Sequence, residues 1–184
     1  MLTPIYAGLV ALLAFGPPGP ATQPDQVRQS LDDPTIVAIF DAANTFDIEA
    51  SDLAAKKAVH PDVRKLGSQF AHDHAAVRQQ GRDLAKKLGV TPTPPKTDKS
   101  ARDHADAMSK LNAAKGDAFD QAYLANEVAY HKAVIDAINQ TLLPAIQNAE
   151  LKAFVQKVAP AFEAHLAAAQ KLAEKYGAEA HKSS

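Results

Sequence analysis

Three histidines lie on the apolar stripes of three predicted helices, where an apolar stripe is a set of residues spaced three or four apart on one helix face. His74, His131 and His165 each fall roughly 11–16 residues from the same expected end of a helix bundle, so a rise of about 1.5 Å per residue places them at comparable depth. Glu49 falls at a similar depth on the fourth long helix. Neutral imidazole is a good ligand for zinc, copper and iron, and a carboxylate completes such a shell. The spacing therefore predicts a transition-metal site made by Glu49, His74, His131 and His165.

Two further acidic residues lie close to these histidines along the chain. Glu127 precedes His131 by one helical turn, so the two side chains are stacked neighbours. Glu127 is therefore a candidate fifth metal ligand, or the group that orients the His131 ring through its second nitrogen. Asp73 is rotated by about 100° from His74, so we expect it to contact a neighbouring helix instead. The histidines that fall on turns or polar faces and are expected to be solvated are His60, His72, His104 and His181.

Inward histidines also have explanations that need no metal. Each ring can pair with polar neighbours in a hydrogen-bonded network, or face a wet crevice. The chain contains no Glu-x-x-His sequence, so di-iron chemistry of the ferritin type is not expected. It also lacks the zinc-protease His-Glu-x-x-His motif, a nucleophile elbow, a phosphate-binding loop and a dinucleotide fingerprint. A role without catalysis is therefore favoured over a metal-dependent redox or hydrolytic enzyme.

The composition indicates a single all-α domain. The chain has 184 residues, 46% of them hydrophobic with alanine dominant, and only 6% aromatic. Alanine, leucine, lysine, glutamate and glutamine are good helix formers. The net charge of −1 gives no electrostatic footprint for nucleic acid or anionic lipid, so no nucleic-acid partner is expected. Cysteine is absent, which excludes disulfides and thiolate ligands.

The first residues have the pattern of a secretory signal peptide. Residues 1–15 form an apolar run, and residues 16–21 are rich in Gly, Pro and Ala. We predict a signal peptide over residues 1–21 and a flexible mature N-terminus over residues 22–32. About 12 consecutive apolar residues are too few to span a bilayer, so no membrane span is expected in the mature chain. The predicted location is therefore periplasmic or secreted.

The remainder divides into four long helices and one short one. Helical periodicity predicts long helices over residues 33–59, 61–88, 117–142 and 148–176. Asp33 is the expected N-cap of the first, and Gly177 the expected terminator of the last. A proline-rich linker over residues 91–97 precedes a short helix over residues 100–111, for which Ser100 and Asp103 resemble a capping box. Short turns make each long pair an antiparallel hairpin, so residues 33–177 are expected to form a four-helix bundle, followed by a flexible tail over residues 178–184.

An ordered set of short segments resembles a known family. These segments are Glu49 with Leu53-Ala54, Val63 through Phe70-Ala71 to Asp73-His74, Phe119-Asp120 with Tyr123-Leu124 and His131, and Leu151-Lys152-Ala153-Phe154 leading to Pro160 and His165-Leu166. Together they span about residues 33–176. The chain resembles the bacterial exported proteins grouped as domain of unknown function 4142, often labelled predicted outer membrane proteins. The resemblance implies an envelope location and a ferritin-like, up-down four-helix bundle with the short extra helix in its middle crossover, and it implies no established activity.

The sequence thus predicts an exported helical bundle that binds zinc, copper or iron through Glu49, His74, Glu127, His131 and His165. The alternative is a non-catalytic interaction or stress-response module of the envelope, whose core histidines are structural or sense pH. The sequence identifies no protein partner.

Overall fold

The computed structural model describes the backbone of residues 31–182 and the side chains of residues 31–177. The predicted signal peptide over residues 1–21 and most of the predicted flexible N-terminus lie outside the described residues. Residues 183–184 at the end of the predicted tail also lie outside them.

Seven helical segments make up most of the described residues, and no strand occurs among them, which confirms the all-α prediction. They are α2 (Asp33–Lys57), α3 (Pro61–Leu88), α4 (Ser100–Ala113), α5 (Asp117–Ala137), the π-helical η1 (Ile138–Leu142), α6 (Leu143–Ala145) and α7 (Ala149–Lys182). No helix of this described part is long and apolar enough to cross a membrane.

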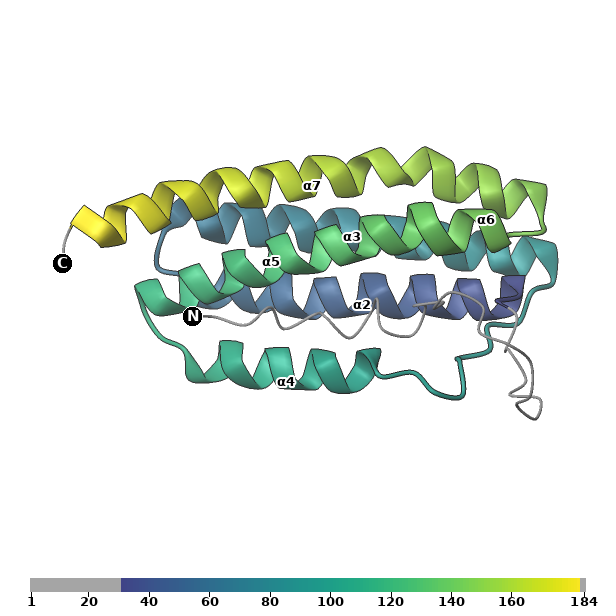
Figure 1. Ribbon diagram of the computed structural model, residues 1–184, viewed down its shortest axis with the longest axis horizontal. Helices are drawn as coiled ribbons and strands as arrows, with labels where there is room; N and C mark the ends of the chain where they lie inside the picture. Colours follow the sequence, from purple (N-terminus) through teal and green to yellow (C-terminus); the bar gives the residue numbers. More distant parts are fainter. Residues whose placement is uncertain (1–30, 183–184) are drawn as a thin grey trace, which may run out of the picture.

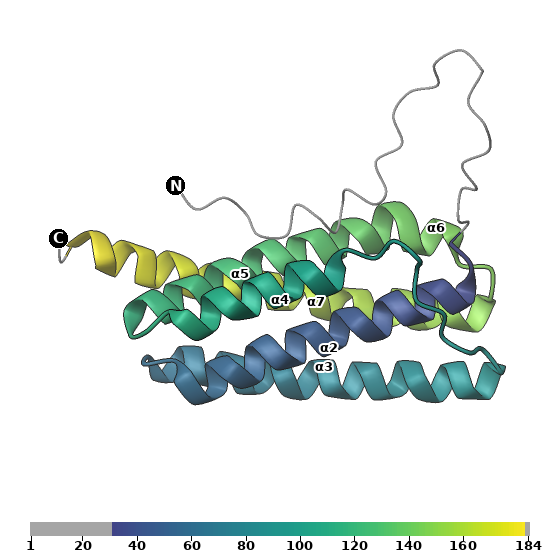
Figure 2. The same cartoon turned by 90° about the horizontal axis from the view of Figure 1, so that it is seen from below.

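Four long helices lie side by side (Figures 1 and 2). α2 packs on α3 and α5 packs on α7, and the two pairs meet through contacts of α3 with α7 and of α2 with α5. The linker after α3 and the helix α4 run back along the outside of α2 and α5, so that α5 has the same direction as α3 (Figure 2). The middle connection therefore follows the length of the molecule instead of only crossing its end.

Local interactions explain where the first two long helices begin and end. Asp32, not Asp33, is the N-cap of α2, because its side chain accepts a hydrogen bond from the Thr35 N–H at 2.9 Å. The Asp33 carboxylate instead accepts from the backbone N–H groups of Gln147 and Asn148, and so joins α2 to the loop before α7. Gly89 ends α3 in the left-handed conformation with φ of 68°, as its position predicts.

Three helix boundaries differ from the sequence-based expectation. α4 begins at Ser100, but its N-cap is Lys99 and no side chain forms a capping hydrogen bond, so the expected capping box is wrong. The Ser100 N–H donates to Asp98 instead. The helix before Pro144 continues through a π-helical turn to Ala145, because the proline falls in the first turn of α6, where its missing N–H is tolerated. α7 passes through Gly177 to Lys182, since that glycine does not adopt a positive φ.

The core consists of two hydrophobic clusters with a polar layer between them. The first cluster, toward the α6 end, includes Ile36, Phe40, Val134, Val155 and Phe162. The second, toward the opposite end, includes Ala54, Val63, Phe70, Phe119 and Leu124. The buried polar side chains between them are Asn44, Asp47, Ser51, His74, Glu127, His131 and His165. The four long helices thus meet around a layer of polar groups at mid-length.

Two glycines of α3 offer a matched test of this packing. A Cβ on Gly67 would lie 2.7 Å from the Ser51 carbonyl oxygen and 2.9 Å from the Ala55 nitrogen, both backbone atoms of α2. A Cβ on Gly81 would lie no closer than 3.5 Å to any neighbour, which is ordinary contact. We therefore expect Gly67→Ala to lower the free energy of unfolding by about 1–3 kcal/mol, and Gly81→Ala to raise it by up to about 1 kcal/mol.

Urea denaturation followed by circular dichroism measures both changes. A Gly67→Ala variant as stable as the parent chain would show that α2 and α3 do not approach as closely as described.

Candidate metal centre

The three predicted histidines meet in the polar layer, each contributed by a different helix. His74 on α3, His131 on α5 and His165 on α7 are all buried, and their ring nitrogens lie within 4.8 Å of one another. The His74 Nε2 atom is 3.4 Å from His131 Nε2 and 3.1 Å from His165 Nδ1. We call these three residues the histidine cluster.

The nitrogen on the other side of each ring has its own acceptor. His74 Nδ1 donates to the Asn44 side-chain oxygen at 2.9 Å, and the Asn44 amide nitrogen donates to the Phe40 carbonyl, which fixes the amide orientation. His131 Nδ1 donates to the backbone carbonyl of Glu127 at 3.1 Å. These partners assign the proton to Nδ1 in both rings. The Nε2 atoms of His74 and His131 therefore present lone pairs to the cluster.

His165 is held in the reverse orientation and reaches nearest to solvent. Its Nε2 donates to the Asp73 carboxylate at 3.2 Å, so its Nδ1 lone pair faces the cluster. The Asp73 side chain is 38% exposed and that of His165 9%, whereas the His131 side chain is fully buried. Asp73 of α3 bonds to α7, which confirms its expected contact with a neighbouring helix.

Three lone pairs that face one another at these distances attract a cation. Two nitrogens bound at about 2.0–2.1 Å to a tetrahedral ion lie roughly 3.3–3.4 Å apart. The two measured separations, 3.1 and 3.4 Å, are close to that value. A buried lone pair without a donor is costly, and a metal ion relieves three of them together.

Two buried carboxyl groups adjoin the histidine cluster. Asp47 Oδ1 lies 3.4 Å from His74 Nε2, and Asp47 Oδ2 lies 3.7 Å from His131 Nε2. The Ser51 hydroxyl donates to Asp47 Oδ1 and in turn accepts a hydrogen bond from the Tyr123 hydroxyl at 3.0 Å. Asp47 Oδ2 and Glu127 Oε2 have no hydrogen-bond partner among the described residues. A fixed carboxylate with a free oxygen thus stands beside the lone pairs.

Glu49 does not reach the histidine cluster. Its side chain is 54% exposed and accepts a hydrogen bond from His104 Nε2 at 2.7 Å. Asp47 is therefore the residue of α2 whose carboxylate adjoins the histidines, and the choice of Glu49 is corrected. The expectation that His104 is solvated is also wrong, because its ring is buried and stacks on Phe46 with centroids 4.4 Å apart.

The remaining site predictions agree with the structure in part. Glu127 stacks beside His131, with its Oε2 atom 3.5 Å from His131 Nδ1, but the backbone carbonyl and not the carboxylate holds the ring. His72 is exposed, as expected. His60 is only half-buried and bonds to Asp120 at 2.8 Å. The side chain of His181 lies outside the described residues.

Sequence reasoning missed Asp47 because it took the apolar residues of α2 as the buried face. The buried face in fact follows Ile36, Phe40, Asn44, Asp47, Ser51 and Ala54, at spacings of three and four residues. Its middle positions are polar, so the stripe does not stand out by hydrophobicity. Spacing without a hydrophobic signal does not single out one face of a helix, so nothing in the sequence pattern indicated Asp47.

Burial keeps two of the histidines neutral. Removal from water is the largest cause that lowers the pKa of His74 to about 3, and the nearby His165 lowers it further. Burial likewise lowers the pKa of His131 to about 4, with Asp47 acting in the opposite direction. Both rings therefore carry a free lone pair at neutral pH, which is the form that binds a metal.

Burial has the reverse effect on the acidic members of the layer. It raises the pKa of Glu127 well above its ordinary value, and the negative charge of Asp47 raises it further. The pKa of the Tyr123 hydroxyl is also raised, chiefly by burial. Burial and the charge of Asp47 therefore both favour the protonated form of Glu127 in the folded protein.

Comparison with known proteins identifies one family and one similar fold. The sequence profile of the family described as "Domain of unknown function (DUF4142)" matches residues 17–172. No curated protein matches the chain in sequence. The solved structure "CopM in the Cu(II)-bound form" superposes with a TM-score of 0.60 and 14% sequence identity, covering 78% of this chain and 98% of that one. At this identity the likeness shows a shared fold alone.

The raised pKa of Glu127 predicts a pH-dependent effect of Glu127→Gln in chelator-treated protein. Above about pH 4.5 the unfolded chain loses this proton while the folded chain keeps it, so the parent protein loses stability as the pH rises. Glutamine cannot titrate. The free energy of unfolding of the variant should therefore increase relative to the parent by up to about 1.4 kcal/mol per pH unit above pH 4.5.

Denaturant titrations between pH 4 and pH 8 provide the measurement, with exposed Glu163→Gln on α7 as the control. A constant difference between Glu127→Gln and the parent across this range would contradict a protonated Glu127.

Proposed function

The chain belongs to the DUF4142 family, and we propose that its histidine cluster binds one divalent transition-metal ion. His74, His131 and His165 each contribute one nitrogen, and Asp47 contributes a carboxylate oxygen as the fourth ligand. Three convergent lone pairs carry this proposal, because no described residue donates a hydrogen bond to any of them. Glu127 is the candidate fifth ligand, because ligand atoms of Asp47, Glu127 and His131 also lie within 4.8 Å of one another.

The donor set favours ions that prefer imidazole. The ligands are nitrogen and oxygen, and the chain has no cysteine. Imidazole suits copper, zinc and iron, while the separations of the nitrogens suit a tetrahedral ion such as zinc. The Cu(II) ion of the similar CopM structure makes copper the first ion to test. We propose copper or zinc as the bound ion, with iron as the third candidate.

The setting that we propose for this site is a ferritin-like bundle, with one long crossover between two antiparallel helix pairs, exported from the cytoplasm. The antiparallel pairs α2–α3 and α5–α7 with a long middle connection support this topology. The apolar run at residues 1–15, followed by small residues up to Ala21, supports removal of a signal peptide and a periplasmic location. The mass of the protein recovered from the periplasm of an expressing bacterium tests both removal and export.

Elemental analysis of the purified chain tests the metal proposal. Protein prepared without an affinity tag or chelator should hold about one equivalent of copper or zinc. Chelation should lower its melting temperature, since an ion that binds only the folded state stabilises it by about 2.7 kcal/mol at one hundred times its Kd. Replacing His165 with alanine should weaken binding by more than about 100-fold, the upper range for loss of a supporting partner.

His72→Ala is the matched control, because His72 is an exposed histidine of the same helix as His74. This substitution should leave the metal affinity unchanged. Circular dichroism verifies that each variant folds. Failure of the folded parent chain to take up copper, zinc or iron on titration would refute the proposal and favour a purely structural or pH-sensing cluster.

A second pair of variants tests which carboxylate of α2 is the ligand. Asp47→Asn removes the buried charge beside His74 and His131 and should lower the metal affinity at least tenfold. Glu49→Gln changes an exposed side chain whose hydrogen-bond partner is His104. The metal affinity of this variant should therefore stay within twofold of the parent.

Metal titrations monitored by competition with a chromophoric chelator give both affinities. If Glu49→Gln bound the metal more weakly than Asp47→Asn, Glu49 and not Asp47 would be the carboxylate ligand of α2.

A further inference from the structure

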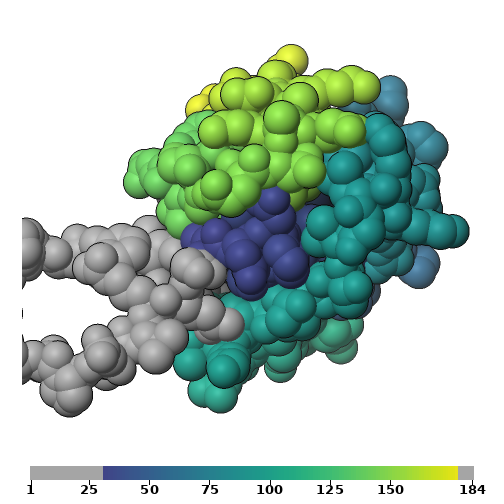
Figure 3. Space-filling model, turned by 90° about the vertical axis from the view of Figure 1, so that its right-hand side faces the viewer, coloured from purple at the N-terminus to yellow at the C-terminus, as the bar shows by residue number. Residues whose placement is uncertain are grey.

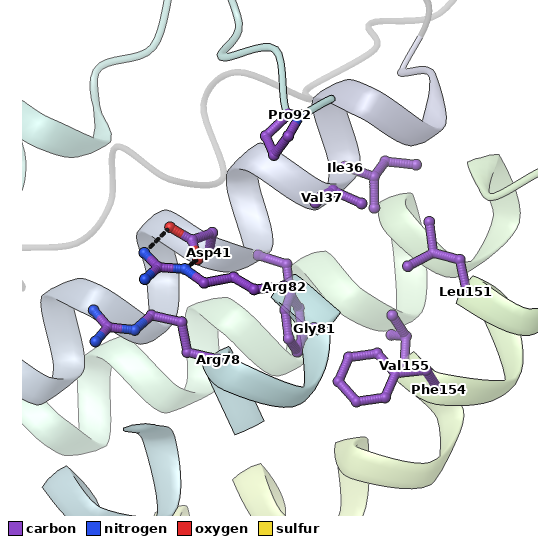
Figure 4. A pocket seen from close by; sticks show the side chains of 11 residues that line it. Ile36, Val37, Asp41, Arg78, Gly81, Arg82, Pro92, Leu151, Phe154 and Val155 are labelled. Carbon is purple, nitrogen blue, oxygen red and sulfur yellow. Dashed lines mark hydrogen bonds and ion pairs between the residues drawn. The ribbon is translucent and has the colours of Figure 1, made fainter. Parts of the chain in front are cut away.

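A cavity lies near the α6 end of the molecule, apart from the histidine cluster. The cavity has a volume of about 250 Å³ and is bounded by α2, α3, α7 and the linker residue Pro92 (Figure 4). In Figure 3 the purple start of α2 lies between the yellow-green start of α7 and the teal end of α3 with its linker. None of the lining residues belongs to the histidine cluster.

The walls of the cavity are apolar. Ile36 of α2 lies opposite Leu151 and Val155 of α7 (Figure 4), and Phe40 and Phe154 complete the apolar lining. The Phe40 and Phe154 rings form an edge contact with centroids 5.7 Å apart. Such a volume is slightly below the roughly 300 Å³ at which pockets for drug-sized molecules begin, so the fitting ligand is a small molecule with one apolar chain or ring.

Gly81 helps to keep this space open. A glycine inside a helix is less favourable than alanine, so its presence calls for an explanation. Backbone freedom is not the explanation at Gly81, because its φ is not positive. Close helix packing is not the reason either, since a Cβ would meet Phe154 at 3.5 Å and Phe40 at 3.6 Å. Close helix packing does explain Gly67, which lies directly against the α2 backbone. The missing side chain of Gly81 instead leaves room beside the two phenylalanine rings.

The rim of the cavity carries excess positive charge. Arg82 forms two hydrogen bonds to Asp41, at 2.5 and 2.9 Å, and so occupies both oxygens of that carboxylate. Arg78 donates to the Thr45 hydroxyl at 3.1 Å and forms no ion pair with any described carboxylate. The guanidinium of Arg78 therefore offers free donors in the planar arrangement that matches a carboxylate.

We propose that this cavity binds a small amphiphilic carboxylate of the medium-chain fatty-acid class. The apolar chain lies against Leu151, Val155 and the paired rings of Phe40 and Phe154, and the carboxylate bonds to Arg78 at the rim. The charge of the rim favours an anion, the walls favour a hydrocarbon, and the glycine provides the space. Because this site and the metal site share no residue, either can be disproved without the other.

Calorimetric titration of the full chain with octanoate tests the proposal, and 1-octanol serves as a probe with the same chain length and no charge. Octanoate should bind with a stoichiometry of one and a negative heat-capacity change, which is the mark of apolar burial. Arg78→Gln should weaken octanoate at least tenfold and leave 1-octanol unchanged. Arg102→Gln, at an exposed arginine of α4, is the control and should have no effect.

Gly81→Leu supplies an independent test, since the larger side chain fills the cavity without removing any charge. It should abolish octanoate binding while metal uptake and the helical circular dichroism signal remain as in the parent. Absence of saturable octanoate binding to the parent would overturn the proposal. So would octanoate binding that survives both Arg78→Gln and Gly81→Leu, because the ligand would then sit elsewhere.

Discussion

The convergence of three imidazole lone pairs on one buried point is the constraint on which the rest of this structure depends. Each ring is prevented from turning away by a partner at its other nitrogen. Those partners are the Asn44 amide on α2, the Glu127 carbonyl on α5 and the Asp73 carboxylate on α3. The hydrogen bonds of Asn44 and Asp73 link different helices, so the relative positions of the helices also set the geometry of the site. Close contact of α2 and α3 at Gly67 contributes to that alignment, because it leaves little freedom for one helix to slide along the other.

A polar layer at this depth lowers the stability of the fold in the absence of a ligand. It separates two hydrophobic clusters that apolar side chains at the same positions would join into one core. Asp47 and Glu127 add two carboxyl groups to three imidazoles in a region without solvent, and one oxygen of each lacks a partner among the described residues. Burying unsatisfied groups of this kind costs on the order of 1–3 kcal/mol each. Such an arrangement is better explained by binding than by packing.

The histidine cluster could be predicted from the sequence because each of its members interrupts a stripe that is otherwise hydrophobic. Asp47 could not be found in the same way, since Asn44 and Ser51 beside it on the same face are polar as well. The predicted buried face of α2 is therefore rotated by about one residue from the observed face. This rotation placed Glu49 on the inner side of the helix. His104 was missed for a related reason. The helix α4 is short and buries only one narrow face against α2 and α5, so its periodicity carries little information. Gly177 shows a limit of a different kind, because a glycine permits a helix end without requiring one.

A proton and a metal ion are the two species that can satisfy converging lone pairs, and the surroundings discriminate between them. Protonation of His74 or His131 is unfavourable, because burial and the neighbouring rings hold both pKa values well below neutrality. A proton also joins only two of the three nitrogens. A divalent ion binds all three together, and the negative charge of Asp47 compensates part of its own charge in a medium of low dielectric constant. Burial that disfavours a proton on His74 and His131 leaves their lone pairs free for a metal ion, provided that the ion brings enough coordination energy to replace its water shell. Three imidazoles and one carboxylate supply that energy for copper and zinc, which form strong bonds to nitrogen, far better than for magnesium or calcium, which prefer oxygen ligands.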